Sequence, residues 1–432
     1  RNHAFGNNAL YANTTGSQVA AIGYNALRFN TTGTDNVAVG NYALLTNVSG
    51  SSNTGIGVSA LTTNTANNNT GVGWWALKAN TTGERNTVLG TSVAASNTTG
   101  SHNTAVGQAA LYANTTGSNN TAIGRYALGL NTTANNNTAL GFYALNANTT
   151  GGDNIGVGVS ALVSNTTGNN NTAFGNYALD ANTTGGQNTG FGHNALSAVT
   201  TNSWNTAFGY QALKANTGGK NTGFGYQALA SNVGSEQIVA IGYNCMSAST
   251  TGAQNTAVGA DCMATNINGY NNVAVGFAAL ELNESGGNST AIGYKALEAA
   301  TVGNNTAVGY QALYVNTTGT RNTALGQQAL DANTTASDNT AVGYDALTAN
   351  TTGTANVAVG SYALDANTTA NNNTAVGYAA LSAVTTGMSN TGVGKDALLV
   401  STTGINNCGF GVNALEANTT GSNNTALGKQ AL

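Results

Sequence analysis

Residues 305–321 read Asn-Thr-Ala-Val-Gly-Tyr-Gln-Ala-Leu-Tyr-Val-Asn-Thr-Thr-Gly-Thr-Arg, and residues 322–338 repeat the pattern as Asn-Thr-Ala-Leu-Gly-Gln-Gln-Ala-Leu-Asp-Ala-Asn-Thr-Thr-Ala-Ser-Asp. The glycine that closes each small–apolar–glycine triplet, called here the reference glycine, recurs 26 times from Gly6 to Gly428. Of the 25 intervals between these glycines, 22 are 17 residues long and three are 16 residues long. A repeat this short and regular predicts a solenoid in which each unit forms one coil.

Two positions of the repeat are always or nearly always large and apolar. The residue before the reference glycine is Val, Ile, Leu or Phe in all 26 units, and Leu stands four places after it in 23 units. Ala94, Met246 and Met263 replace that Leu. We expect both positions to form the interior of a coil built from two short strands and turns. The sequence therefore predicts an all-β parallel β-solenoid of about 26 coils, continuous over residues 1–432.

A third position, two places before the reference glycine, is restricted to small residues. It is Ala in 18 units, Gly in seven and Val88 once. Alternate residues of a strand point to opposite faces, so this position is expected on the face opposite the predicted interior. Close packing against another chain would explain the restriction; the alternative is that tight coil geometry alone requires small residues. The predicted inter-chain positions include Ala38, Ala105, Ala122, Ala257 and Ala375.

Asparagine fills two further positions. It stands four places before the reference glycine in 23 of 26 units and seven places after it in 20 of 25. Asn suits turns and left-handed backbone geometry, and Asn side chains stacked in register form amide ladders. The three short units lose a residue from the Asn-Thr-Thr-Gly-Ser-Asn stretch, as in residues 216–221, which marks that stretch as the loop.

Composition excludes several classes of protein. The chain has 11 Lys and Arg, 15 Asp and Glu, a net charge of −4, three Cys and no Pro. Nucleic-acid binding requires clustered basic residues, which are absent, and no apolar stretch is long enough to span a bilayer. Three cysteines do not make a disulfide scaffold. Regularly placed apolar residues, 41% of the chain, favour order over disorder.

The run Asn-Thr-Ala-Val-Gly-x-x-Ala-Leu resembles the head repeats of trimeric autotransporter adhesins, which carry a Ser-Val-Ala-Ile-Gly-x-x-Ser-x-Ala pattern. It is also similar to repeats of phage-tail-fibre-type proteins that carry a self-cleaving chaperone. The resemblance extends along all 26 units, although the unit here is somewhat longer than the adhesin repeat. It implies a left-handed β-roll, three chains around one axis, and small residues that face the neighbouring chain.

The loops contain candidate glycosylation sites. Asn-x-Thr/Ser occurs in 16 of the 25 loops and is the acceptor motif for N-glycans in secreted proteins. The competing interpretation is turn chemistry, because sugars on successive coils about 4.8 Å apart would crowd one another. The candidate sites are Asn13, Asn30, Asn80, Asn114, Asn182, Asn316 and Asn418.

An aromatic stripe forms a second candidate site. The residue after the reference glycine is aromatic in 11 units. Such a stripe can bind sugar faces or pack against a neighbouring fibre, whereas the simpler explanation is stacking between coils. The candidate contact residues are Trp74, Trp75, Tyr210, Tyr226, Tyr243, Tyr294 and Tyr310.

Catalysis and metal binding have little support. The three histidines occupy different positions of the repeat and form no predicted ligand cluster. Asp331, Asp338 and Asp345 also occupy different positions and are predicted to be solvated surface charges. Cys245 and Cys262 replace Ala in adjacent coils, which predicts core residues whose parallel directions suit a disulfide poorly. No cofactor, no metal and no enzymatic activity is expected.

The sequence favours an extracellular structural fibre, on a cell surface or a virion, that associates with further copies of itself. The first alternative is a receptor- or glycan-binding shaft in which the aromatic stripe or the loops contact surface glycans or host receptors. The second is an ice-binding solenoid, since ranks of Thr on a flat face can order water. The Thr-Thr pairs lie in loops, which disfavours ice binding.

Overall fold

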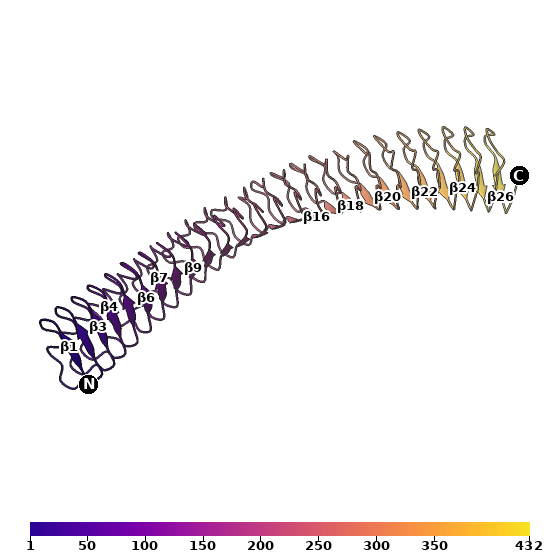
Figure 1. Ribbon diagram of the computed structural model, residues 1–432. Helices are drawn as coiled ribbons and strands as arrows, with labels where there is room; N and C mark the ends of the chain where they lie inside the picture. Colours follow the sequence, from indigo (N-terminus) through magenta and orange to yellow (C-terminus); the bar gives the residue numbers. More distant parts are fainter. The chain divides into compact units, whose positions relative to one another are not determined.

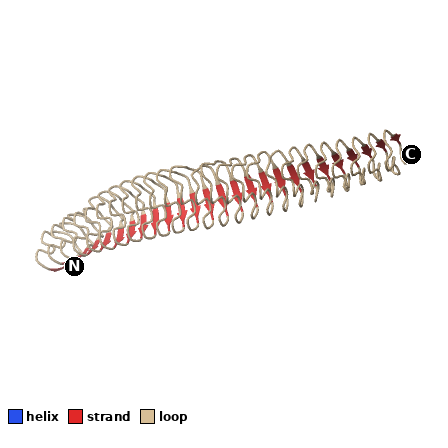
Figure 2. Ribbon diagram, turned by 90° about the horizontal axis from the view of Figure 1, so that it is seen from above, coloured by secondary structure: helices blue, strands red, loops and turns tan.

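A computed structural model describes residues 1–432 and contains 26 strands of three residues each, with no helix. Each coil has a single strand, and turns form the rest of it (Figure 2). The expectation of two strands per coil is therefore wrong. After the reference glycine the backbone enters left-handed geometry twice, as at Gln311 (φ 51°) and Leu313 (φ 52°), which turns the chain before a second strand can form.

Contacts divide the chain into two units, residues 1–217 and 218–432, which are described separately. The strands of the first unit are β1 (His3–Phe5), β2 (Ala20–Ile22), β3 (Val37–Val39), β4 (Thr54–Ile56), β5 (Thr70–Val72), β6 (Thr87–Leu89), β7 (Thr104–Val106), β8 (Thr121–Ile123), β9 (Thr138–Leu140), β10 (Ile155–Val157), β11 (Thr172–Phe174), β12 (Thr189–Phe191) and β13 (Thr206–Phe208). Those of the second are β14 (Thr222–Phe224), β15 (Val239–Ile241), β16 (Thr256–Val258), β17 (Val273–Val275), β18 (Thr290–Ile292), β19 (Thr306–Val308), β20 (Thr323–Leu325), β21 (Thr340–Val342), β22 (Val357–Val359), β23 (Thr374–Val376), β24 (Thr391–Val393), β25 (Cys408–Phe410) and β26 (Thr425–Leu427).

Within each unit every strand pairs in parallel with the strand of the next coil (Figure 1). The register matches equivalent positions of the repeat, so that Thr104 pairs with Thr121 and Ala105 with Ala122. Backbone hydrogen bonds between coils continue beyond the strands, for example from Leu128 N to Ala144 O at 3.0 Å. The chain is thus a parallel β-solenoid with a 17-residue repeat, as the sequence predicts, and strands of three residues suffice because the turns are also bonded from coil to coil.

The interior of each coil is narrow and filled by one large and two small residues. The Leu four places after the reference glycine is buried, as the sequence predicts, and so is the Ala before it. The small residue of the strand points inward against them. A Cβ added at Gly55 would lie 3.2 Å from Leu44 Cγ of the preceding coil, so there is little room for more than a methyl group.

The two faces of the strand are therefore the reverse of the sequence-based expectation. The large apolar residue before the reference glycine points outward: Leu89 is 51% exposed and Phe174 is 46% exposed. The alanines predicted to contact another chain are fully buried within their own coils, so that prediction is wrong. They are Ala38, Ala105, Ala122, Ala257 and Ala375. The restriction to small residues comes instead from the tight coil.

The reference glycine is required for two reasons. At Gly40, φ is 134°, a conformation that side chains rarely adopt, and an added Cβ would lie 2.5 Å from the carbonyl oxygen of Gly57 in the next coil. Backbone conformation and coil-to-coil spacing both exclude a side chain there. The same glycine consequently occurs in all 26 units.

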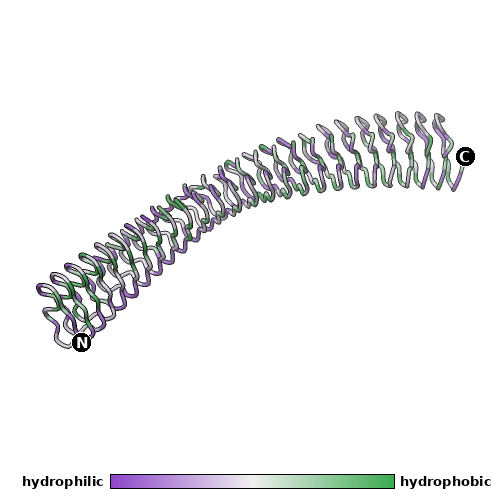
Figure 3. The backbone as a smooth tube through the Cα atoms, viewed as in Figure 1, coloured by the Kyte–Doolittle hydropathy of each residue, from purple (hydrophilic) through white to green (hydrophobic).

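The predicted asparagine ladders are present and buried. In the first ladder, Asn97 Nδ2 donates to Asn80 Oδ1 of the preceding coil at 2.7 Å and to the carbonyl oxygen of Gly100 in its own loop at 2.9 Å. In the second, the oxygen Oδ1 of Asn103 accepts from the backbone N of Asn120 at 3.0 Å. Hydrophilic and hydrophobic stretches both recur along the coils (Figure 3). The ladders satisfy amide groups that would otherwise be costly to bury.

Candidate functional site

The outward side chains at the first and third positions of the strands form a surface, called here the strand face. Its first position is Thr in 18 of 26 coils, and its third is always Val, Ile, Leu or Phe. No Asp, Glu, Lys or Arg occurs at either position. Apart from the first strand, all residues between these positions are buried, while the outward ones are partly or well exposed. Each unit thus presents an uncharged, largely apolar sheet face to solvent.

Part of the strand face in the first unit is aromatic. Phe174 and Phe191 stack with ring centroids 4.7 Å apart, and Phe191 and Phe208 stack at 4.6 Å. The ring planes deviate from parallel by no more than 6°. The in-register pairing of β11, β12 and β13 imposes this spacing. Three large rings thereby form one continuous exposed surface.

The predicted aromatic stripe lies beside the strand face, and its rings stack between coils. Tyr226 and Tyr243 are 5.3 Å apart, and so are Tyr294 and Tyr310. In the first unit, Tyr210 stacks on His193 at 5.5 Å, while Trp74 and Trp75 stack within one coil at 3.9 Å. Stacking between coils is confirmed, and contact with a ligand or a neighbouring fibre stays a prediction.

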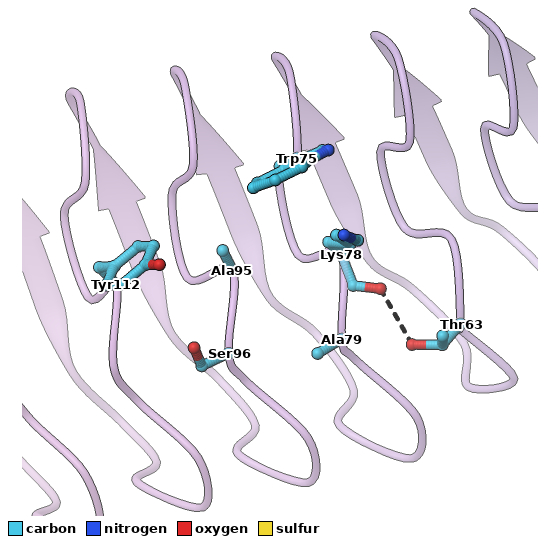
Figure 4. A pocket seen from close by; sticks show the side chains of 7 residues that line it. All are labelled: Thr63, Trp75, Lys78, Ala79, Ala95, Ser96 and Tyr112. Carbon is cyan, nitrogen blue, oxygen red and sulfur yellow. Dashed lines mark hydrogen bonds between the residues drawn. The ribbon is translucent and has the colours of Figure 1, made fainter.

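A hollow of about 390 Å³ lies on another side of the first unit, bordered by Trp75 and Tyr112 (Figure 4). Its other lining residues are Thr63, Lys78, Ala79, Ala95 and Ser96. A smaller hollow of about 210 Å³ shares Tyr112 with it and is lined by Ser92, Gln108, Ala109, Tyr112 and Tyr126. Only Trp75 of these residues was a candidate from the sequence. Tyr112 was missed because its position, five places after the reference glycine, is too variable to form a stripe.

The candidate glycosylation sites are mostly inaccessible. Asn30, Asn80, Asn114, Asn182 and Asn316 are fully buried. Their Nδ2 atoms, to which a glycan would be attached, donate to the loop carbonyl three residues on; Asn114 Nδ2 is 2.9 Å from Gly117 O. A glycan on these five residues is incompatible with the folded coil. Asn13 and Asn418, in the first and last coils, are partly buried and make the same loop bond.

The first Thr of most Thr-Thr pairs in the loops forms a hydrogen bond to the next coil. Thr98 Oγ1 donates to the carbonyl oxygen of Thr115 in the next coil at 3.0 Å, and Thr115 Oγ1 donates to Thr132 O at 3.0 Å. These hydroxyl groups form a ladder along the loops. The second Thr of each pair, such as Thr99 and Thr116, is exposed, and the Thr residues of the strand face form a further rank that is partly or well exposed.

The acidic residues differ in environment. Asp338 is exposed and paired with Arg321 of the preceding coil (Oδ1 to Nε 2.6 Å), and this hydrogen bond lowers its pKa. Asp331 is half-buried; burial, and then the charge of Asp345, raises its pKa. The prediction of solvated surface charges is therefore correct for Asp338 and wrong for Asp331, which lies between neighbouring coils.

Cys245 and Cys262 lie in the core as the sequence predicts, and both are free thiols. A hydrogen bond with Cys262, reinforced by burial, holds the pKa of the Cys245 thiol above its usual range. Each thiol lies 3.4 Å from a strand carbonyl of the next coil, Cys245 from Ala257 O and Cys262 from Ala274 O. Cys408 is partly exposed at the first position of β25.

No group of three His, Cys, Asp or Glu side chains is arranged to hold a metal ion. The structure also has no long apolar helix of the kind that crosses a membrane.

Fold and surface together define the chain as a parallel β-solenoid repeat protein with an exposed, uncharged strand face. Comparison with known proteins takes the assignment no further: no protein-family model matches the chain, and no curated protein shows significant similarity to it.

Proposed function

We propose that the chain is a segment of an extracellular structural fibre, of the adhesin-head or tail-fibre type, and that its strand face packs against a second copy of the same chain. The observation that carries this proposal is the outward orientation of the large apolar residue in every coil. Interior packing requires only small residues in the strand, so a role inside the coil does not account for the Val, Ile, Leu or Phe at this position. Contact with another surface accounts for it.

The size of the strand face supports a protein partner. Thirteen strands about 4.8 Å apart and about 10 Å long give each unit a face of about 600 Å². This is at the upper limit of apolar patches on monomers, about 300–600 Å². A stable interface buries about 800 Å² per partner, so the face of a single unit supplies most of the area that such an interface needs.

Charge and shape favour a second copy over an unrelated partner. The face carries no Asp, Glu, Lys or Arg, so two copies meet without charge repulsion. Flat sheets pack face to face about 10 Å apart with interdigitated side chains. Two identical faces have the same coil spacing, so their ridges match along the whole contact. The resemblance to trimeric repeats is compatible with three copies, with the strand face replacing the buried alanines as the contact.

Charged substitutions on the strand face test the proposal. We expect the native chain to sediment as an oligomer and to show more than one solenoid per cross-section in electron micrographs. The double variant Val342→Glu with Val376→Glu should sediment as a monomer, with unchanged circular dichroism. Glutamates in alternate coils avoid direct repulsion within one chain but oppose association.

The matched control is Asn372→Asp with Asn406→Asp. It adds two charges at exposed positions where Asp338 already shows that an acid is accepted. This control should associate like the native chain. A native chain that is monomeric at all concentrations would refute the proposal, and so would a glutamate variant that associates like the control.

A second candidate, ice binding, is favoured by one observation. The strand face places Thr, in 18 of 26 coils, and an apolar residue in two ranks with a spacing of about 4.8 Å. Such an array can order water instead of a partner. Thermal hysteresis and ice shaping by a monomeric chain would support this candidate, whereas a chain without either effect would exclude it.

A further inference from the structure

We propose that the hollow between Trp75 and Tyr112 binds an acidic glycan, a chain of sugar residues that carry carboxylate or sulfate groups. The site lies on the turns of the first unit and not on the strand face. It rests on the glycan-binding alternative for function and does not depend on association between copies.

The geometry provides two walls and a flat floor. Figure 4 shows residues of four successive coils around the hollow, with Trp75 and Tyr112 separated by the coil that carries Ala95 and Ser96. Trp74 stacks against the Trp75 indole at 3.9 Å and restricts its orientation. Ala79 and Ala95 form the apolar part of the floor. Trp74 and Lys78 cover the two faces of the Trp75 indole, so the apolar floor and the Tyr112 ring are left to contact the C–H face of a sugar ring.

The coil at the centre of the hollow is also where the repeat is broken. Val88 is the only residue other than Ala or Gly in its inward strand position, and Ala94 is the only replacement of the core Leu by a residue smaller than Met. Between Gly90 and the loop, the residues of this coil that are not buried are all small, namely Thr91, Ser92, Ala95 and Ser96. Twenty-six copies show what the fold requires, so a coil that departs from them, flanked by large aromatic residues, indicates a local role beyond the fold.

The length of the hollow suits an oligosaccharide. The two hollows share Tyr112, and together they are bordered by three aromatic residues, Trp75, Tyr112 and Tyr126; the two hollows are called here the groove. Successive coils are about 4.8 Å apart, about the width of one saccharide ring. A glycan that runs along the solenoid therefore places successive rings over successive coils. The hydroxyl groups of Ser92 and Ser96 lie in the groove to bond with sugar hydroxyls.

The charge of the groove selects an anion. No Asp or Glu lines either hollow, although the chain as a whole has a net charge of −4. Lys78 Nζ lies 4.0 Å from the centre of the Trp75 ring, at the wall of the larger hollow. Arg125 Cζ lies 5.1 Å from the Tyr126 ring at the end of the smaller one. Cations held against aromatic rings beside both hollows favour a ligand with repeated negative charges.

Calorimetric titration of the full chain provides the test. The probes are oligogalacturonate and heparin oligosaccharides, compared with uncharged malto-oligosaccharides of equal length. We expect binding of at least one acidic probe, weakened by salt, and at least tenfold weaker binding of the neutral one, a difference of about 1.4 kcal/mol. The variant Lys78→Gln should lose affinity for the acidic probe and show a weaker salt dependence.

Filling the hollow tests its location. Ala95→Leu should weaken binding at least tenfold, because the added side chain occupies the floor. The fold accepts Leu at this position of the repeat, as Leu45 and Leu399 show. Ala264→Leu is the control, with the same substitution at the equivalent position of a coil that lines neither hollow. It should bind like the native chain.

Each outcome has a defined meaning. Binding of no probe, or equal binding of acidic and neutral probes, would overturn the assignment of an acidic glycan. Equal loss in Ala95→Leu and Ala264→Leu would overturn the location. Sedimentation of the same samples reports association separately, so failure here is distinguishable from failure of the fibre proposal.

Discussion

Asn333 Nδ2 lies 2.7 Å from Asn316 Oδ1 of the preceding coil, and both side chains are fully buried. The same nitrogen donates to Ala336 O at 3.1 Å, while Asn350 Nδ2 donates to Asn333 Oδ1 at 3.0 Å. One buried amide thus connects three coils. Buried amides stabilise a fold only while their partners are present, which makes this ladder a specific point of vulnerability.

Asn333→Ala is expected to destabilise the chain by about 2–3 kcal/mol, because Asn316 Oδ1 loses its donor and a cavity remains. Chemical denaturation of the native chain and the variant measures this change. Gln327→Ala, in the same coil, removes an exposed amide at a position where Ala260 occurs naturally, and should change stability by less than about 0.5 kcal/mol. Equal effects of the two substitutions would contradict a role of the ladder in stability.

The inward position of the strand gives a second prediction. Ala375→Leu should cost about 1–3 kcal/mol, because Ala375 is fully buried within its own coil and the added atoms overfill it. Val376→Leu, the next residue, changes an outward side chain to one that other coils carry there and should be close to neutral. Denaturation at a concentration where the chain is monomeric separates this effect from association. If the Ala375→Leu variant has the same free energy of unfolding as the native chain, the sequence-based prediction that this side of the strand faces another chain would be supported again.

Glycosylation gives a third prediction. When the chain is secreted from eukaryotic cells, the folded fraction should carry no N-glycan at Asn30, Asn80, Asn114, Asn182 or Asn316. The Nδ2 atoms of these residues are buried in hydrogen bonds of the core, so a modified chain cannot close the coil. Peptide mass spectrometry of the protease-resistant fraction measures the occupancy. A glycan on Asn114 in correctly folded protein would show that the loop opens.

The environments of Asp331 and Asp338 predict opposite responses to pH. Burial raises the pKa of Asp331 above 3.8 in the folded chain. At a pH above this raised pKa, the ionised carboxylate lowers the free energy of unfolding. This destabilisation is lost as the pH falls below 3.8, because the carboxyl group is then protonated in both states. Asp331→Asn should therefore stabilise the chain at pH 7 and have little effect at pH 3. The melting temperature measured at both pH values tests this.

Arg321 lowers the pKa of Asp338, so that pair contributes stability that is present above pH 3.8 and is lost as the pH falls through the lowered pKa. Asp338→Asn should therefore slightly lower the melting temperature at pH 7. It should have less effect once the native carboxyl group is protonated. The same pH response for Asp331→Asn and Asp338→Asn would contradict the assignment of their environments.

Much of the fold was predictable because 26 copies of the unit sample the tolerated residues at each position. The coil length, the buried Leu and the Asn ladders all follow from positions that hardly vary. The orientation of the strand was not predictable in the same way. The assumption that the larger apolar residue points inward fails here because Leu44 and its equivalents already fill the narrow interior, which leaves the strand room for Ala or Gly alone.

The same distinction applies to the candidate sites: one was predictable from the repeat and another was not. The aromatic stripe was visible because its residues share one position of the repeat. Trp75 and Tyr112 occupy different positions of the repeat, and they border the same hollow because only the coil that carries Ala95 and Ser96 lies between them. A repeat alignment compares equivalent positions, so it does not reveal neighbours of this kind.

The sequence by itself determined the solenoid, its repeat length and the residues that every coil must keep, because spacing and restriction are properties of the chain alone. Only the tertiary structure decided which face of each strand meets solvent, which asparagines are inaccessible to modification and which side chains of different coils form a common surface. Those features depend on how much space the coil encloses and on how neighbouring coils stack, and the repeat pattern contains neither quantity.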